Sequence, residues 1–248
     1  MPRNSRPSLI QKIAKQADIT FKNCCSPGIG HSKEFAANLT ELGALLNRIR
    51  AADLNVIARK DASGSAESSG PQAHLSAPVS YTHICETRTF SMGVFTLRSG
   101  ASIPLHDHPD MNGMLKVLYG KVRIRCFDKS EPGPDSQAPV PEEKESVRLA
   151  VLRACGEFTE HSAPCVLSPH RDNLHQIDAL DGPAAFLDIL APPYDPDHGR
   201  DCHYYRVLRT DTQNGDDTKK ETVWLLEIPQ PEEFWCGGEP YRGPRVTV

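Results

Sequence analysis

The residues best suited to chemistry form one spaced motif, which reads Gly100-x5-His106-x-His108-x4-Gly113-x6-Gly120. Side chains two residues apart on a β-strand point to the same face, so His106 and His108 can present two imidazoles to one ion. The flanking glycines are typical of turns. A histidine pair at this spacing also occurs as surface decoration. If the pair binds a metal, we expect a third ligand from a downstream strand.

Two downstream histidines, His170 and His175, are candidates for that third ligand. His175 begins an apolar run that predicts a strand, whereas His170 lies among charged residues typical of a turn. We therefore expect His175 to be the ligand. His170 would then be a solvated loop residue or a hydrogen-bond donor near the site.

The elements that must position these histidines lie from Val79 onward, where short β-rich runs alternate with Gly, Pro and Asp. This pattern predicts a mainly β antiparallel barrel or sandwich. The expected strands are Val79 to Glu86, Phe90 to Arg98, Met114 to Tyr119, Lys121 to Phe127, Val147 to Arg153, Cys165 to Ser168, His175 to Ala179, Ala184 to Ala191, His203 to Leu208 and Val223 to Ile228.

Residues 1–59 predict a helical region, because apolar residues recur at helical spacing over 9–17 and over 35–49. A segment rich in Cys, Pro and Gly, 24–30, separates the two expected helices. Residues 60–78 are rich in Ser, Gly and Ala and are expected to form a flexible linker, which leaves 79–248 as the β domain. The polar insertions at 130–146 and 209–221 are expected to be exposed loops.

One acidic residue occupies an unusual setting. The segment Ala184 to Ala191 is apolar on both faces except for Asp188, and a charge in such a strand needs a partner or a function. A carboxylate of this kind can accept a proton or bind a substrate amine. The alternative is a structural carboxylate that caps a loop or pairs with a cation such as Arg171.

Composition excludes several classes of function. The 248 residues hold 28 Lys and Arg against 32 Asp and Glu, for a formal net charge of -4, so we expect no nucleic-acid partner. No apolar run approaches the roughly 20 residues of a membrane span, so we also expect no membrane partner. The 8 cysteines lack Cys-x-x-Cys spacing, which favours free thiols. We also expect the protein to be a cytoplasmic monomer. An alternative reading of the first 17 residues, which carry four cations and no acid, is an organelle-targeting peptide.

The glycine and histidine motif resembles the first motif of the cupin superfamily, and 169–177 resembles a degenerate second motif. In the family, a Glu ligand occupies the position that Gly113 fills here, and the ligand His of the second motif corresponds to His175. The resemblance implies a cupin barrel, that is, a jelly-roll or double-stranded β-helix, with an N-terminal helical region. Three neutral imidazoles without the Glu leave open coordination positions, which favours Fe(II) that binds an anionic substrate and O2.

Within the cupins, longer segments are similar to the family of cysteamine dioxygenases and plant cysteine oxidases. These segments are Ile103-Pro-Leu-His-Asp-His-Pro, Gly113-Met-Leu-Lys-Val-Leu-Tyr-Gly, His170-Arg-Asp-Asn-Leu-His-Gln, Phe186-Leu-Asp-Ile-Leu-Ala-Pro-Pro-Tyr and Asp201-Cys-His-Tyr-Tyr. The resemblance implies an iron enzyme that adds O2 to a thiol to give a sulfinic acid. The implied substrates are cysteamine, which gives hypotaurine, and proteins with an N-terminal Cys, whose oxidation is linked to oxygen-dependent degradation.

The resemblance also implies roles for four residues besides the histidines. Asp188 matches an acidic pocket residue of the family and Tyr194 a pocket-lining tyrosine, although Tyr194 could equally serve ordinary packing. Cys202 and Tyr204 stand two apart, and a thioether between them is implied. The alternative is a free Cys beside a Tyr.

Two other functions stay open. A free-cysteine dioxygenase would need an Arg for the substrate carboxylate, and no Arg in the motifs clearly serves that purpose. A non-enzymatic cupin could hold a metal for structure alone.

Overall fold

The computed structural model describes residues 6–22, 32–58, 77–131, 147–211 and 221–248. The segment expected between the two helices therefore lies outside the described residues, as do nearly all of the expected linker 60–78 and most of the insertions 130–146 and 209–221. The three domain boundaries at 1–59, 60–78 and 79–248 stay predictions.

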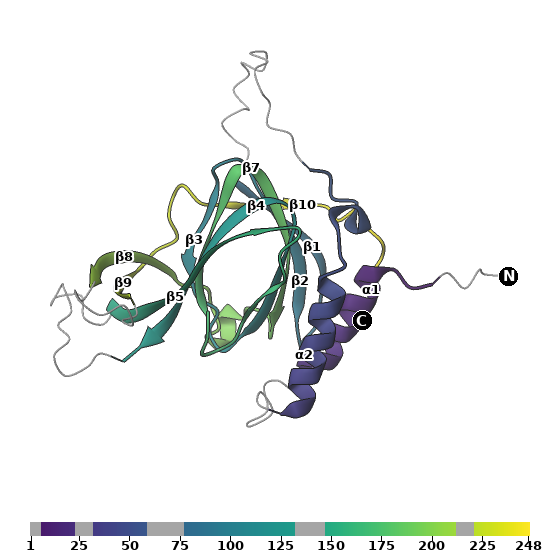
Figure 1. Ribbon diagram of the computed structural model, residues 1–248, viewed down its shortest axis with the longest axis horizontal. Helices are drawn as coiled ribbons and strands as arrows, with labels where there is room; N and C mark the ends of the chain where they lie inside the picture. The colour runs from purple at the N-terminus through teal and green to yellow at the C-terminus, as the bar shows by residue number, and fades with distance from the viewer. Residues whose placement is uncertain (1–5, 23–31, 59–76, 132–146, 212–220) are drawn as a thin grey trace, which may run out of the picture.

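Ten strands build the fold, and they confirm the expected mainly β class (Figure 1). They are β1 (Val79–Glu86), β2 (Ser91–Leu97), β3 (Ser102–His106), β4 (Asn112–Ser130), β5 (Val147–Thr159), β6 (Cys165–Leu167), β7 (Leu174–Ala191), β8 (Tyr204–Asp211), β9 (Thr222–Ile228) and β10 (Cys236–Glu239). Hydrogen bonding follows the order β10-β1-β2-β7-β3-β8-β9-β5-β4-β6, and a further pairing of β7 with β4 closes a barrel.

The two longest strands, β4 and β7, join both sides of the barrel. Each had been expected as two separate strands, and this expectation is wrong. In β4, Gly120 adopts a φ of +74°, and a Cβ there would lie 2.3 Å from the carbonyl oxygen of Pro183. The glycine therefore lets the chain bend against β7 without ending the ladder of hydrogen bonds, which resumes at Lys121 opposite Leu180.

Two short strands were missed. Strand β3 contains Pro104, and β10 contains Gly237 and Gly238, residues that are depleted in strands. Strand β8 also continues to Asp211, into the segment that had been expected to be a loop from Arg209. Tertiary pairing with β7, β1 and β9 outweighs the local preference in these three places.

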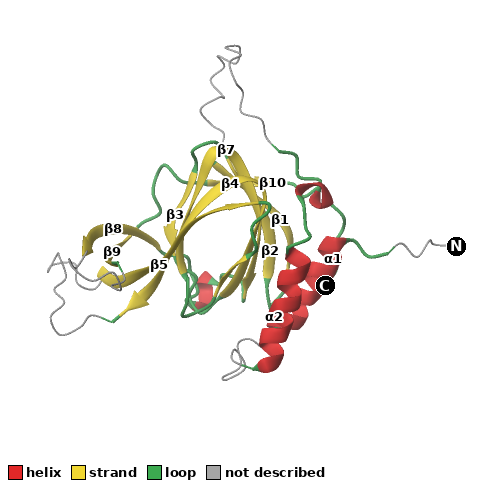
Figure 2. Ribbon diagram, in the orientation of Figure 1, coloured by secondary structure: helices red, strands yellow, loops and turns green. Residues whose placement is uncertain are grey.

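Two helices confirm the expected N-terminal helical region, and they lie side by side on the outside of the barrel near β1 and β2 (Figure 2). Ser8 caps α1 (Leu9–Phe21) and Ser32 caps α2 (Lys33–Leu46), each through its hydroxyl oxygen. A short 3-10 helix, η2 (Ala51–Leu54), follows. The apolar faces of the helices share one core with outward residues of β2, β4 and β7. The buried members of this core include Ile13, Ala17, Phe21, Leu42, Leu46, Met92, Val94, Met114, Leu187 and Ile189.

Within the part of the chain that the structure describes, no helix is both long enough and apolar enough to cross a membrane.

Candidate metal and thiol site

Three buried histidines come together inside the barrel: His106, His108 and His175. Their potential ligand atoms all lie within 4.8 Å of one another. The ring centroids form a nearly equilateral triangle with sides of 4.7, 4.8 and 4.6 Å. In the described ranges this is the one cluster of three or more potential metal ligands. His170 lies apart from it, exposed in a turn.

Strand register explains how two of these histidines meet. His106 at the end of β3 is paired with His175 of β7 on one side and with Tyr204 of β8 on the other. Directly paired residues of antiparallel strands project to the same face, so the two imidazoles and the phenol share the barrel interior. His108 lies beyond the end of β3, so the expected strand alternation does not explain its orientation.

Asn173 holds His108 in place instead. The side-chain oxygen of Asn173 accepts a hydrogen bond from the backbone N–H of His108 (3.2 Å), and its amide donates to the carbonyl of His108 (2.7 Å). The backbone carbonyl of Asn173 also lies 2.8 Å from Nδ1 of His108. Likewise Nδ1 of His106 lies 2.8 Å from the carbonyl of Pro104. A ring nitrogen beside a carbonyl carries the proton, which leaves Nε2 of His106 and of His108 free to bind a metal.

The electrostatics of the triad suit a cation. Burial lowers the pKa of all three histidines, and the neighbouring imidazoles lower the pKa of His108 further, to about 3, and that of His175 as well. The rings are therefore neutral at physiological pH, as ligands must be. Three convergent neutral nitrogens fit a divalent transition metal and leave open coordination positions.

A cavity of about 230 Å³ lies beside the triad, and all seven of the predicted site residues line it: His106, His108, His175, Asp188, Tyr194, Cys202 and Tyr204. Apolar side chains such as Phe95, Ile103 and Phe186 form much of its wall. Phe234 is a buried lining residue, and Gln230 and Cys236 are exposed, so they lie at the rim. The cavity can hold a small thiol or the first residue of a polypeptide.

Asp188 is the acidic group of this cavity. Its desolvation raises the pKa of the carboxyl from 3.8 to about 7. Among the described residues no Lys or Arg pairs with it, and Arg171, which had been considered as a structural partner, pairs with Asp172 at 3.5 Å. The phenols of Tyr81 and Tyr194 lie near enough for the Asp188 charge to raise their pKa. No protein cation compensates the ionised form of Asp188 in this setting.

Cys202 lies between two phenols. Its thiol is within hydrogen-bonding range of the hydroxyls of Tyr194 and Tyr204, while burial raises the pKa of the thiol to about 11. Cys202 precedes β8, so it lies outside the strand that carries Tyr204. Both side chains nevertheless face the same cavity.

Sequence reasoning missed Asp107, the residue between the first two histidines. Its buried carboxylate accepts hydrogen bonds from Lys129 Nζ (2.9 Å), from the backbone and Nδ1 of His203 (3.0 Å each) and from Tyr205 (3.0 Å). Its carbonyl accepts one from Tyr194 (2.8 Å). Burial alone would raise the pKa of Asp107, but Lys129 and the other donors lower it below the ordinary value. Asp107 therefore ties the ligand segment to the segment that carries Cys202 and Tyr204.

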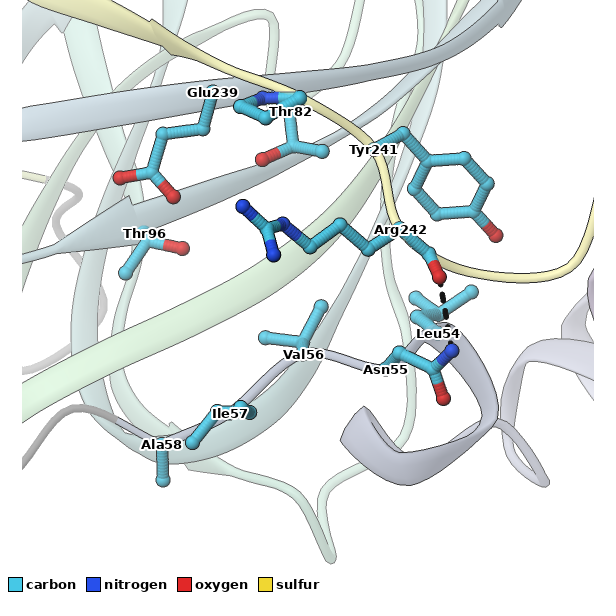
Figure 3. A pocket seen from close by; sticks show the side chains of 11 residues that line it. Leu54, Asn55, Val56, Ile57, Ala58, Thr82, Thr96, Glu239, Tyr241 and Arg242 are labelled. Carbon is cyan, nitrogen blue, oxygen red and sulfur yellow. Dashed lines mark hydrogen bonds between the residues drawn. The ribbon is translucent and has the colours of Figure 1, made fainter.

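A larger cavity, of about 450 Å³, lies elsewhere, between residues 54–58, β1, β2 and the C-terminal residues 239–242 (Figure 3). Asn55 donates a hydrogen bond to the carbonyl of Arg242 (2.9 Å) across one end of it, and the Arg242 side chain extends along it. It contains none of the predicted site residues and no histidine. The predicted site residues line the smaller cavity in the barrel.

Comparison with known proteins identifies the family of the chain. A model of the PCO_ADO family matches residues 45–246. The chain belongs to this family. The 2-aminoethanethiol dioxygenase of Mus musculus is 54% identical to the chain, and that of Homo sapiens 51% identical, each over 99% of both chains. Plant cysteine oxidase 1 of Arabidopsis thaliana is 34% identical over 72% of this chain and 62% of its own length.

Two solved structures are similar to about half of the chain. KdgF from Halomonas sp. has 13% identity and a TM-score of 0.33, and covers 48% of this chain and 84% of its own. An RmlC-like cupin from Shewanella frigidimarina has 10% identity and a TM-score of 0.34, and covers 50% of this chain and 84% of its own. The strand pairings of the chain itself confirm the expected mainly β barrel.

Proposed function

We propose that the chain is a non-haem Fe(II) thiol dioxygenase that converts cysteamine to hypotaurine and the N-terminal Cys of proteins to Cys-sulfinic acid. The observation that carries this proposal is that the neutral three-histidine cluster and Asp188 line the same cavity. The chain is also a member of the PCO_ADO family. The relatives named as 2-aminoethanethiol dioxygenases and plant cysteine oxidases support a thiol substrate with a nearby amine.

The metal would be held by Nε2 of His106, Nε2 of His108 and a ring nitrogen of His175. When bound, Fe(II) supplies the positive charge that keeps the substrate thiol ionised and the redox chemistry through which O2 reacts. The reaction R–SH + O2 → R–SO2H is balanced, because both oxygen atoms end on sulfur and sulfur supplies all four electrons. No separate reductant is needed.

The residues around the metal would bind and orient the thiol. Apolar walls at Phe95 and Phe186 exclude water from the carbon chain of the substrate. The Asp188 carboxylate, which lacks a protein cation, accepts a proton or a hydrogen bond from the substrate ammonium. Tyr194 is held by the Asp107 carbonyl and lines the cavity beside His108, with ring centroids 5.9 Å apart. We propose that the thioether between Cys202 and Tyr204 also forms here.

The rim of the cavity allows both substrate sizes. A small thiol such as cysteamine is enclosed, whereas the rest of a polypeptide would leave the cavity past Gln230 and Cys236. A free-cysteine dioxygenase is less well supported, because among the described residues no Arg or Lys lines the cavity to bind a substrate carboxylate. We further propose a monomer in the cytoplasm that links O2 to degradation of its protein substrates.

Metal analysis and oxygen consumption test this proposal. Purified protein reconstituted with Fe(II) is incubated with cysteamine, a peptide with a free N-terminal Cys, or free cysteine, and products are identified by mass. We expect one iron per chain and a gain of two oxygen atoms on cysteamine and on the peptide, with slower turnover of free cysteine. The variant His175→Ala serves as the control without a complete triad. Iron binding without oxygen consumption for any thiol would favour the non-enzymatic cupin, and fast turnover of free cysteine alone would favour the other dioxygenase.

A further inference from the structure

A second, much smaller cavity touches the site from another side. It has a volume of about 20 Å³, which exceeds the roughly 10–15 Å³ that one water-sized molecule needs. Leu115, His175 and Asp188 line both this cavity and the larger one, so the two cavities are neighbours and share one histidine of the triad. The rim residues Gln230 and Cys236 do not line the smaller cavity.

Strand register explains where this small cavity lies. Leu115 of β4 is paired with Asp188 of β7 on one side and with Cys165 of β6 on the other. Cys126, further along β4, is paired with His175. Paired side chains project to the same face, so the cavity lies between β4, β6 and β7 beside a predicted metal ligand, and it is open on one side. Its outer wall includes Val166, whose side chain is 43% exposed, so the cavity lies close to the surface.

The chemistry of the lining suits a small apolar guest. The wall is formed by Gly113, Leu115, Ile124, Cys126, Cys165 and Leu167, with Asp172 as a polar residue besides the two that it shares with the site. Burial raises the pKa of both Cys126 and Cys165 to about 12, so these thiols are uncharged and behave as small hydrophobic groups. A mostly apolar cavity of this size can admit an apolar gas molecule.

The main cavity would be obstructed when the thiol substrate is in place, because a polypeptide that enters by its N-terminus must leave through the rim. A second reactant then needs another path. We propose that the small cavity between β4, β6 and β7 admits O2 and holds it beside the metal triad while the thiol occupies the main cavity. This inference rests on the proposed dioxygenase function.

Kinetics against O2 concentration test the proposal. Cys165→Leu and Leu167→Phe each enlarge a lining side chain, and neither residue lines the main cavity. The matched control is Cys155→Leu, at an exposed cysteine of β5 outside the described cavities. We expect both filled variants to bind iron and to keep the parent KM for cysteamine, while the KM for O2 rises several-fold. The control should match the parent. An unchanged KM for O2 in folded, iron-loaded Cys165→Leu and Leu167→Phe would overturn the proposal.

A gas-binding measurement tests the cavity independently of activity. Crystals of the parent protein without thiol are pressurised with xenon, and we expect a xenon atom between Cys126 and Leu167 that is absent from Cys165→Leu. An ordered water in that place and no xenon would overturn the proposal, whatever the kinetics. Should Cys165→Leu not fold, Cys165→Val makes the same comparison with a smaller change. If the parent consumes no O2 with any thiol, the dioxygenase function fails, and the xenon result still reports on the cavity.

Discussion

Replacing Asp188 by Asn separates a catalytic carboxylate from a structural one, because the structure predicts opposite effects on activity and stability. The carboxyl has a pKa of about 7 in the folded protein against 3.8 as the ordinary value, a difference worth about 4 kcal/mol at 1.36 kcal/mol per unit. The folded-state pKa is raised, so the associated stability is fully present below pH 3.8 and is lost as the pH rises to about 7. Above that pH the native protein contains an ionised, uncompensated carboxylate.

The Asn variant avoids this cost because it stays neutral. Since water can enter the cavity that Asp188 lines, we discount the difference to about 1–2 kcal/mol. For a chain of this length that corresponds to a Tm higher by roughly 2–8 °C at pH 8, with the gap closing towards pH 4. Unfolding is measured in the presence of a chelator, because a bound cation would itself favour the ionised carboxylate.

The activity of Asp188→Asn should fall, although its stability rises. Turnover per iron should fall by roughly 10² to 10⁴, the contribution of a positioned acid or base, and the acidic limb of the pH profile that reports ionisation of Asp188 should disappear. Asp178→Asn is the matched control, since Asp178 lies on the same strand outside the cavity, where its carboxylate accepts hydrogen bonds from Ser102 and Gln176. A lower Tm for Asp188→Asn at pH 8 together with full turnover per iron would refute the reasoning and make Asp188 a structural residue.

The remaining predictions concern the ligands, the substrate, the thioether and the buried carboxylate beside the triad. His175→Ala should lose iron and activity, whereas His170→Ala, at an exposed turn, should keep both in metal analysis. Acetylation of an N-terminal Cys peptide should greatly slow its oxidation if the amine helps to fix the thiolate; equal rates would exclude that role. After turnover, intact-mass analysis of the parent should show a species lighter by two hydrogen atoms. A bond forms between Cys202 Sγ and a ring carbon of Tyr204, and O2 accepts the two electrons and two protons released. Cys202→Ser should lack this lighter species. Tyr205→Phe removes one hydrogen bond to the Asp107 carboxylate and should lower the free energy of unfolding by about 2 kcal/mol in denaturant titration, with iron content retained.

Local sequence patterns predicted much of the barrel because its strands carry their own signals. The bounds of β1 agree with the expected Val79 to Glu86, and β9 is one residue longer at its start. The patterns failed where long-range pairing overrides local preference, as at Pro104 in β3 and at the bend of β4 at Gly120. A glycine followed by a change in alternation indicates either a turn or a bent strand, and only the partner strand decides between them.

At the site, too, local sequence patterns predicted some residues and missed those defined by long-range contacts. Their two-residue spacing singled out His106 and His108. His175 and Asp188 were singled out because each is a polar residue in an otherwise apolar strand. Asp107 carried a signal as well, an acid between two candidate ligands, but its donors come from β4 and from 203–205 and are distant in sequence. The Asn173 contacts with His108 were equally hidden, because a backbone carbonyl leaves no trace in a residue pattern.

Packing leaves no room for the glutamate that the cupin motif, which this sequence resembles, has at the position of Gly113. A Cβ at Gly113 would lie 2.9 Å from Cγ of Leu167 and 3.0 Å from Cδ2 of Leu190, so even an alanine would have to displace its neighbours. Leu167 comes from β6, which pairs with β4 at this position, and Leu190 from β7 on the opposite side. A longer acidic side chain would need both strands to move, and its charge would have to be buried between two leucines. The close approach of β6 and β7 to β4 therefore leaves no space for a carboxylate side chain at position 113. If the three neutral histidines hold a divalent ion as proposed, the ion keeps its full charge for an anionic thiolate.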